Sequence, residues 1–512
     1  MNIIKKIGAL TVASTFFFSC SKLEEKHRDA LVRASAASVS SADILKSIYE
    51  GDIRNFMNQD NIWALEEHTT DECAGPTRGG DWDDNGIWRV LNQHTWDANH
   101  NFVRGAFENL GRIGFNATDA LSRSPNPQQT AEAKFLRAFA NFFLIEGWDQ
   151  APYRDNLTDL TIVPQVRKGN DAMTFIISEL EGALPALPNG PVHIANKNAC
   201  RALLMKCYLT KGVVANRATP TFAAADMNKV IEYANQIINS SSTTLNPSYF
   251  QNFAPNNNTS NENLFTGINY GGTSSGGVRS RYFCSLHYNQ SPSGWNGFTT
   301  LSDFYDKFEN GDRRRGGPYP GVTNISGMNV GLLLGQQIDQ NGVLRKDRKG
   351  NPLSFTRAVK PIETNPNTLE VTGIRVVKYP PDYNNGDNVD NDYVFLRLAD
   401  VLLMKAEAIQ RGGTGIAAGP YGTTALAIVN YIRTQPSRGA SALPSLSLNQ
   451  LCDERGRELY WEGWRRQDLI RFGLFNAPNN IRTAASDPSR NLFPVPAQQL
   501  SVNPNLSQNS GY

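Results

Sequence analysis

Cysteine and histidine are scarce in this chain, whose 512 residues contain six of each. Five cysteines follow Cys20, an odd number at wide spacing, so a disulfide framework is not expected. Cys200 and Cys207 would lie about 10 Å apart along one helix, which is beyond the reach of a disulfide. No C-x-x-C pair or H-E-x-x-H motif occurs, and the histidines lack metal-site spacing. These absences remove the common zinc sites from consideration.

Charge of either sign is not in excess, because 50 Lys and Arg residues face 48 Asp and Glu residues, a formal net charge of +2. This balance gives no indication of a nucleic-acid partner or an acidic surface. The chain also lacks a long linker or a block of like charges that would divide it into domains. With 40% hydrophobic and 10% aromatic residues, it can bury a large core.

The N-terminus has the features of an export signal over residues 1–19. Lys5 and Lys6 precede the apolar segment Ile7–Phe18, which is too short to span about 30 Å of hydrocarbon as a stable helix. Cys20 follows without the usual small-residue cleavage site, as in a loose bacterial lipobox, in which the cysteine is acylated and becomes the mature N-terminus. Multiple acyl chains would anchor the protein stably. The alternative is an ordinary secretory signal in which Cys20 is incidental.

Helical periodicity dominates residues 102–240 and 393–475, where apolar residues recur every three or four positions and proline or glycine marks the junctions. The predicted helices are 42–56, 102–121, 131–147, 171–183, 197–212, 224–240, 393–411, 423–434 and 448–472. Helices that come in pairs, with alanine on their faces, suggest tetratricopeptide-like units. We therefore predict a mostly α fold with few short strands, one of them within 374–379.

Residues 40–101 and 241–391 are instead loop-rich, with much glycine, asparagine and large aromatic residues. Trp63, Trp82, Trp88 and Trp96 lie in the first of these segments. Loops that carry aromatics on a rigid scaffold are natural binding surfaces, since an indole face can stack on a sugar ring. The alternative is that these tryptophans are buried anchors. Trp82, which two aspartates flank, is the one most expected to be exposed.

The ligand site is predicted where the loops of residues 60–100 meet those of residues 280–300. Stacking is assigned to Trp82 and Trp295, hydrogen bonding to several polar groups, and either role to Tyr393. The predicted ligand-binding residues are Trp82, Trp295, Asp71, Asp81, Arg375, Tyr393, Tyr288 and Cys284. If the two tryptophans do not bind, the site is expected at Tyr288 and the Trp88–Trp96 segment.

One acidic loop partly matches a calcium-binding pattern. Asp81-x-Asp83-x-Asn85-Gly86 resembles the first half of such a loop, but position twelve is Asn92 instead of glutamate. No helix-loop-helix pattern flanks it. We therefore expect no cofactor, with a structural calcium ion as the alternative.

The segment Arg455–Gly473 reads R-G-R-E-L-Y-W-E-G-W-R-R-Q-D-L-I-R-F-G and is predicted to be mostly helical. Its charges are dense and of both signs. Glu462 and Arg466 are four residues apart, a spacing that stabilises a helix by about 0.2–0.5 kcal/mol. The expected role is structural, a salt-bridged helix packed through Leu459, Tyr460 and Trp461.

The same segment closely resembles the R-x-R-E-L-x-x-E-G-x-R-x-x-D-L-x-R-x-G signature of the SusD/RagB family of outer-membrane nutrient-binding lipoproteins. Two upstream segments support the resemblance. They are Asn391–Glu407, N-D-Y-V-F-L-R-L-A-D-V-L-L-M-K-A-E, and Ala131–Pro152, A-E-A-K-F-L-R-A-F-A-N-F-F-L-I-E-G-W-D-Q-A-P. The resemblance implies one SusD-like unit over residues 20–512, with a tetratricopeptide-like scaffold and a loop-rich ligand-binding part.

The resemblance also implies a function. Such a protein would capture an oligo- or polysaccharide at the cell surface, without catalysis, and deliver it to a SusC-like TonB-dependent transporter. Glu24 and Glu25, just after Cys20, resemble the surface-export signal of Bacteroidota lipoproteins and imply the outer membrane. One alternative is a repeat lipoprotein that binds proteins, peptides or other nutrients. Another is an exported glycoside hydrolase, which needs paired carboxylates that arise easily by chance among 48 acidic residues.

Overall fold

The fold is mostly helical, with few short strands. A computed structural model describes residues 39–240, 243–273 and 276–512, so the predicted export signal and Cys20 lie outside the described residues. Residues Ser40–Tyr512 form one compact unit. Its helices are α2 (Ser41–Glu50), α3 (Asn61–Glu67), α4 (Ile87–Gln93), α5 (Asn101–Ser122), α6 (Pro127–Trp148), α7 (Gly169–Ala183), α8 (Lys197–Ala215), α9 (Ala224–Ser240), α10 (Ser280–Phe283), α11 (Ser302–Tyr305), α12 (Thr323–Ser326), α13 (Leu398–Gln410), α14 (Ala425–Arg433), α15 (Leu448–Leu459), α16 (Arg465–Arg471) and α17 (Ala497–Val502).

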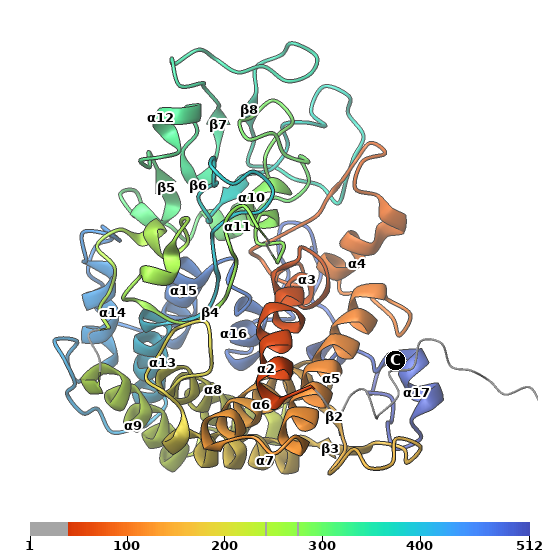
Figure 1. Ribbon diagram of the computed structural model, residues 1–512. Helices are drawn as coiled ribbons and strands as arrows, with labels where there is room; N and C mark the ends of the chain where they lie inside the picture. The colour runs from red at the N-terminus through yellow and green to blue at the C-terminus, as the bar shows by residue number, and fades with distance from the viewer. Residues whose placement is uncertain (1–38, 241–242, 274–275) are drawn as a thin grey trace, which may run out of the picture. The chain divides into compact units, whose positions relative to one another are not determined.

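The strands are short, and several of them pair with strands far away in the sequence. They are β1 (Thr77–Arg78), β2 (Gln150–Tyr153), β3 (Gln165–Lys168), β4 (Asn263–Gly267), β5 (Gly316–Gly317), β6 (Val330–Leu333), β7 (Gly335–Gln336), β8 (Ser354–Phe355), β9 (Ile362–Glu363), β10 (Arg375–Val377) and β11 (Tyr393–Arg397). The described strands form one three-stranded sheet, in the order β10-β6-β5, and four pairs. β10 lies within the strand predicted at 374–379. In Figure 1, β5 to β8 lie with α12 at the end opposite helices α6 to α9.

The helical scaffold is built from neighbours in sequence. Contacts run from α5 to α6, α7, α8 and α9 in turn, and α13 then packs against α9, α14 and α15 (Figure 1). α6 begins with a capping box between Asn126 and Gln129 and has Pro127 at its first position, two signals that favour a helix start here. Ala131, Ala133 and other small residues let α6 be buried on nearly all sides. This packing of successive helices agrees with the prediction that the helices come in pairs.

Three predicted helices are wrong in part, the first two of them at one end. The segment 393–411 begins as strand β11, antiparallel to β4, and becomes helical only at Leu398. Buried aromatic and β-branched residues open it, and these suit a strand between packed layers better than a helix. The segment 42–56 is likewise divided, because α2 ends at Gly51 and a 3₁₀ helix, Asp52–Met57, follows.

The predicted helix 448–472 is broken between α15 and α16. Trp461 and Gly463 have φ angles of 61° and 80°, in the left-handed region that a helix cannot contain. The side chain and backbone of Trp461 both donate hydrogen bonds to Glu72, at 3.0 and 3.1 Å, which holds the unusual backbone in place. The predicted pair of Glu462 with Arg466 therefore does not form. Glu462 binds Arg397 instead, while Arg466 binds Glu146 of α6.

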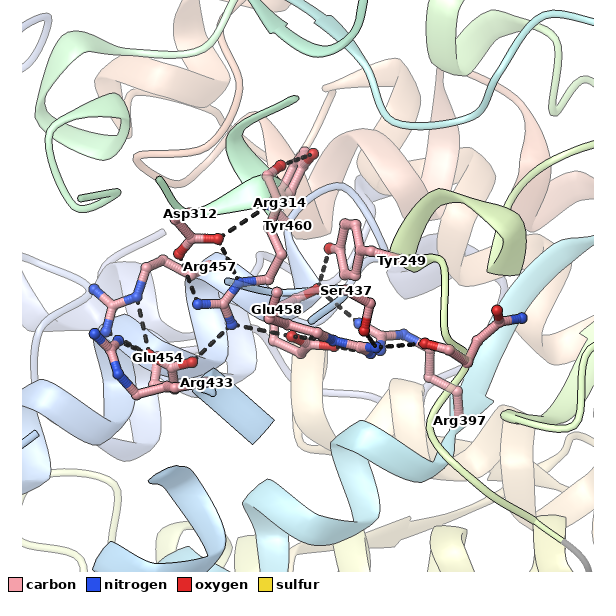
Figure 2. Close-up of polar contacts among 12 residues, drawn as sticks. Tyr249, Asp312, Arg314, Arg397, Arg433, Ser437, Glu454, Arg457, Glu458 and Tyr460 are labelled. Atoms are coloured by element: carbon pink, nitrogen blue, oxygen red, sulfur yellow. Dashed lines mark hydrogen bonds and ion pairs between the residues drawn. The ribbon is translucent and has the colours of Figure 1, made fainter. Parts of the chain in front are cut away.

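The charges of α15 lie inside the protein and form a buried ionic network (Figure 2). The Glu458 carboxylate accepts from Arg397 and Arg438 at 2.7 Å and from Arg314 at 3.0 Å, and all four side chains are fully buried. Arg314 also pairs with Glu454 at 2.7 Å. The predicted structural role of this segment is confirmed, and the network joins α15 to β11 and to the loop that precedes β5.

Candidate functional site

Two loop regions that are far apart in sequence meet where the sequence predicts a site. Ala74 and Thr299 exchange backbone hydrogen bonds of 2.8 and 3.0 Å, which fixes the first region against the second. Phe298, fully buried, lies between them, with its ring 4.9 Å from that of Trp82 and 5.0 Å from that of Trp88. A rigid aromatic core therefore supports the surface above it.

Trp82 and Trp295 lie side by side on this surface. Their ring centroids are 6.2 Å apart, and the Trp82 Nε1 donates a 2.9 Å hydrogen bond to the Trp295 carbonyl. Trp295 is 47% exposed, and Trp82 is partly exposed. The indole of Trp82 packs on Gly297 so closely that a Cβ there would lie 2.2 Å from its ring. Glycine at position 297 is thus required for the position of Trp82.

Tyr288 and Asp81 complete the group, which we call the aromatic site: Asp81, Trp82, Tyr288 and Trp295. The Tyr288 hydroxyl donates to Asp81 Oδ2 at 3.0 Å. Burial, followed by the hydrogen bond to Asp81, raises the pKa of Tyr288, so the hydroxyl keeps its proton. The guanidinium of Arg348 lies 3.9 Å from the centre of the Tyr288 ring. The aromatic site therefore offers an indole face beside a carboxylate, a hydroxyl and a cation.

A second set of residues supports the aromatic site and was not predicted. Glu370 binds Arg348 at 2.6 Å and His287 at 2.9 Å, which orients the side chains around Tyr288. Burial lowers the pKa of His287 to about 4, so its ring is neutral near pH 7. The Phe283 ring lies 5.0 Å from that of Trp295. The basic run of residues 345–349 was the one available signal in the sequence for Arg348.

Three predicted site residues are corrected because they lie in the core. Arg375 and Cys284 are fully buried, and Tyr393 is 3% exposed. Arg375 donates to the side chain of Asn296 at 2.8 Å and to backbone carbonyls. The Tyr393 hydroxyl donates to the Glu462 carbonyl at 3.0 Å. None of these three side chains presents a surface to a ligand.

Asp71 is not part of the aromatic site. Its carboxylate accepts from Arg465 at 2.7 and 2.8 Å. It lines a separate cavity of about 200 Å³ together with Lys307 and Asp453. The structure thus brings together four of the eight predicted residues and assigns Asp71 to another place.

The remaining tryptophans of the first loop region are buried anchors. Trp63, Trp88 and Trp96 are each 5% exposed or less, so the alternative site at Trp88–Trp96 has no accessible ring. The carboxylates of the predicted calcium loop also have protein partners, since Asp83 pairs with Arg89 and Asp84 accepts from Trp88. In the described ranges, no three His, Cys, Asp or Glu side chains gather as a metal site. No described helix is long and apolar enough to cross a membrane.

Comparison with known proteins agrees with this architecture. The model of the SusD family matches residues 234–512, which is more than half of the chain. The chain belongs to the SusD family. The starch-binding protein SusD of Bacteroides thetaiotaomicron is 25% identical over 501 residues, which cover 87% of this chain and 84% of that protein.

Solved structures of SusD-like proteins share the fold. A laminarin-binding SusD-like protein aligns over 92% of this chain and 99% of its own, with a TM-score of 0.67 and 19% identity. Surface glycan-binding protein A from Bacteroides thetaiotaomicron, in complex with laminarihexaose, aligns over 92% and 98%, with a TM-score of 0.66 and 16% identity. At these identities the likeness establishes the SusD fold alone.

Proposed function

We propose that this protein is a cell-surface lipoprotein that binds glycan without cleaving it and delivers it to a SusC-like TonB-dependent transporter. The observation that carries the proposal is the exposed indole of Trp295, held rigidly against Trp82. Aromatic faces of this kind stack on the C–H faces of sugar rings. The names of two relatives, a starch-binding protein and a laminarin-binding protein, support glycan as the ligand class.

The form of the surface also favours a polymer over a small molecule. Small ligands are usually enclosed in pockets that bury most of their surface. The aromatic site instead presents a ring that is half open to solvent, with polar groups at its side. A long chain could lie across such a surface and continue beyond it in both directions.

Affinity electrophoresis against plant, host and microbial polysaccharides tests the proposal. We expect at least one polysaccharide to retard the protein, and chromatography of the same mixtures to reveal no cleavage products. Cleavage would identify a hydrolase instead. Migration unchanged by every polysaccharide would favour a peptide or another nutrient as the ligand.

The anchor and the transporter need separate tests. Cys20→Ala should release the protein from the membrane fraction, because acylation at this residue is proposed to hold it there. Retention of this variant in the membrane, in cells that lack the neighbouring transporter, would contradict the lipid anchor. Purification from cells that contain the transporter should recover both proteins together, and recovery of the lipoprotein alone would contradict the partnership.

A further inference from the structure

Two buried arginines lie beneath the aromatic site without a carboxylate partner. Arg78 is 3% exposed and Arg375 fully buried. Arg78 donates to the Gly297 carbonyl at 3.3 and 3.4 Å and to Thr372 Oγ1 at 2.6 Å. Arg375 donates to Asn296 Oδ1 at 2.8 Å and to backbone carbonyls. In the part of the chain that the structure describes, neither forms an ion pair, and both contact the residues that directly follow Trp295.

These arginines differ from most buried arginines of this protein. Arg314, Arg397, Arg438, Arg455 and Arg466 are equally buried, and each pairs with at least one carboxylate. Arg281 and Arg482 are further exceptions. Arg281 donates to the carbonyls of Met57 and Asn58 and belongs to the segment that leads to Trp295, whereas Arg482 donates to carbonyls elsewhere, including that of Asn92. Among the described residues, three of the four buried arginines without an ion pair, Arg78, Arg281 and Arg375, thus lie in or against the 281–297 segment.

Their positive charge remains at neutral pH. Burial lowers the pKa of Arg78 to about 10, which still leaves it protonated. Burial lowers the pKa of Arg375 as well, and the neighbouring charge of Arg78 lowers it further. A guanidinium keeps its proton under such conditions. In a medium of low dielectric constant, its field extends further than that of a solvated charge.

The rim of the aromatic site adds exposed cations. Arg348 lies over Tyr288, and its partner Glu370 is shared with His287. Lys346 is exposed, and its carbonyl accepts from the side chain of Asn289, the residue after Tyr288, at 2.9 Å, while its ammonium forms no ion pair among the described residues. Arg345 is held against the same rim by carbonyls alone, including that of Asn289 at 2.9 Å.

A further cation lies near Trp295. The Arg279 guanidinium lies 3.5 Å from the centre of the Phe283 ring, which packs against Trp295. Its partner Asp387 is 81% exposed, so this ion pair is open to solvent. Asp81, at 3.0 Å from the Tyr288 hydroxyl, is the acidic member of the aromatic site. Cations thus contact Tyr288 of the aromatic site, Phe283 beside Trp295, and the two residues that follow Trp295.

We propose that the aromatic site selects an acidic glycan, whose uronic acid or sulfate ester binds at Lys346 and Arg348 while a sugar ring stacks on Trp295. This inference rests on the proposed glycan-binding function and adds the chemical class of the glycan. A guanidinium and an ammonium both suit a carboxylate or a sulfate, with which they form strong charge-assisted hydrogen bonds. The balanced net charge of the chain conceals this local excess.

Matched pairs of polysaccharides test the inference with the purified full chain. Polygalacturonate is compared with its carboxyl-reduced form, and a sulfated galactan with its desulfated form, by isothermal titration calorimetry at low and high salt. We expect one acidic member to bind about tenfold or more tightly than its neutral partner, with an affinity that falls as salt rises. The pair that responds distinguishes uronic acid from sulfate.

Equal binding of acidic and neutral partners would overturn the acidic specificity and leave glycan binding intact. Failure of these and every other glycan to bind would overturn the proposed function as well. The double variant Lys346→Gln/Arg348→Gln should lower affinity for the acidic polymer about tenfold, with an unchanged melting temperature. Lys168→Gln, at an exposed lysine of β3, is the matched control. Unchanged affinity in the double variant would contradict the assignment of the acid group to this rim.

Discussion

Two regions of this protein differ in which side chains are buried: one buries its charges, and the other exposes an aromatic ring. The segment around α15 is dense in charge, and its charges lie in the core, where Glu458 binds three arginines. The loops at the aromatic site are rich in tryptophan, and Trp295 faces solvent. Burial of charge costs stability unless each charge is paired, whereas an exposed indole adds little to stability. The first region therefore maintains the fold, and the second is free to serve binding.

The largest effect should come from breaking the ionic network. Glu458→Gln leaves Arg314, Arg397 and Arg438 buried with one fewer anion, so we expect a loss of about 3–5 kcal/mol in unfolding free energy. Chemical denaturation measures this loss. Glu232→Gln is the control, because the pair of Glu232 with Lys229 is exposed and should contribute less than about 0.5 kcal/mol. Similar losses in both variants would contradict the distinction between the regions.

Asp468 extends the same test to pH. Burial raises the pKa of this carboxyl, but the charges of Arg455 and Arg471 outweigh burial and lower the pKa to about 2. Because the folded pKa lies below the unfolded value of 3.8, Asp468 stabilises the fold above pH 4 and loses this contribution as pH falls toward 2.

Asp468→Asn should therefore cost about 3 kcal/mol at pH 7 and much less at pH 2. Urea denaturation across this range measures the difference, with Asp303→Asn, away from the ionic network, as a reference. A cost independent of pH would show that the ionised carboxylate is not the stabilising group.

The sequence predicted the helices better than the breaks and strands that connect them. Helical periodicity and caps identify α5 to α9, because these signals are local. The break at Trp461 depends on hydrogen bonds to Glu72, nearly 400 residues earlier, which no local pattern contains. Strand β11 forms because β4 lies beside it, which is also a contact between segments far apart in sequence.

The aromatic site could be predicted in part for a similar reason. Trp82 is flanked by aspartates and lies in a glycine-rich loop, two features that indicate exposure. Arg375 and Tyr393 carry side chains that suit a ligand, but burial depends on what packs over them. Arg375 begins the buried strand β10, where Val376 and Val377 follow it, and its guanidinium is covered by the loop that contains Asn296. Arg348 contacts the ring of Tyr288, which is 60 residues earlier in the chain, and local sequence does not reveal such a contact.

Trp295→Ala should lower glycan affinity and leave stability almost unchanged, whereas the variants of the ionic network lower stability. With half of its surface in solvent, Trp295 should contribute less than about 1 kcal/mol to stability, while its loss should weaken glycan binding by about 2 kcal/mol. Titration and thermal denaturation of the same variant separate the two effects. Phe115→Ala, at an exposed ring of α5, should change neither. Loss of stability with unchanged affinity would make Trp295 a structural residue.

Tyr288→Phe should have the smallest effect. It removes the hydroxyl that donates to Asp81 and keeps the ring beneath Arg348, so binding should weaken by about 0.5–1 kcal/mol. Calorimetry with the same glycan measures this loss of affinity. Tyr305→Phe, in α11, is the control. An effect larger than that of Trp295→Ala would place the centre of the aromatic site at Tyr288.

A crystal structure with a bound oligosaccharide tests the central claim most directly. The separation of a charged core from an aromatic binding surface predicts a sugar ring stacked on Trp295, within hydrogen-bond distance of Asp81 or Tyr288, with the ionic network around Glu458 unchanged. A ligand bound instead in the cavity lined by Asp71 and Arg465, with Trp295 untouched, would contradict it.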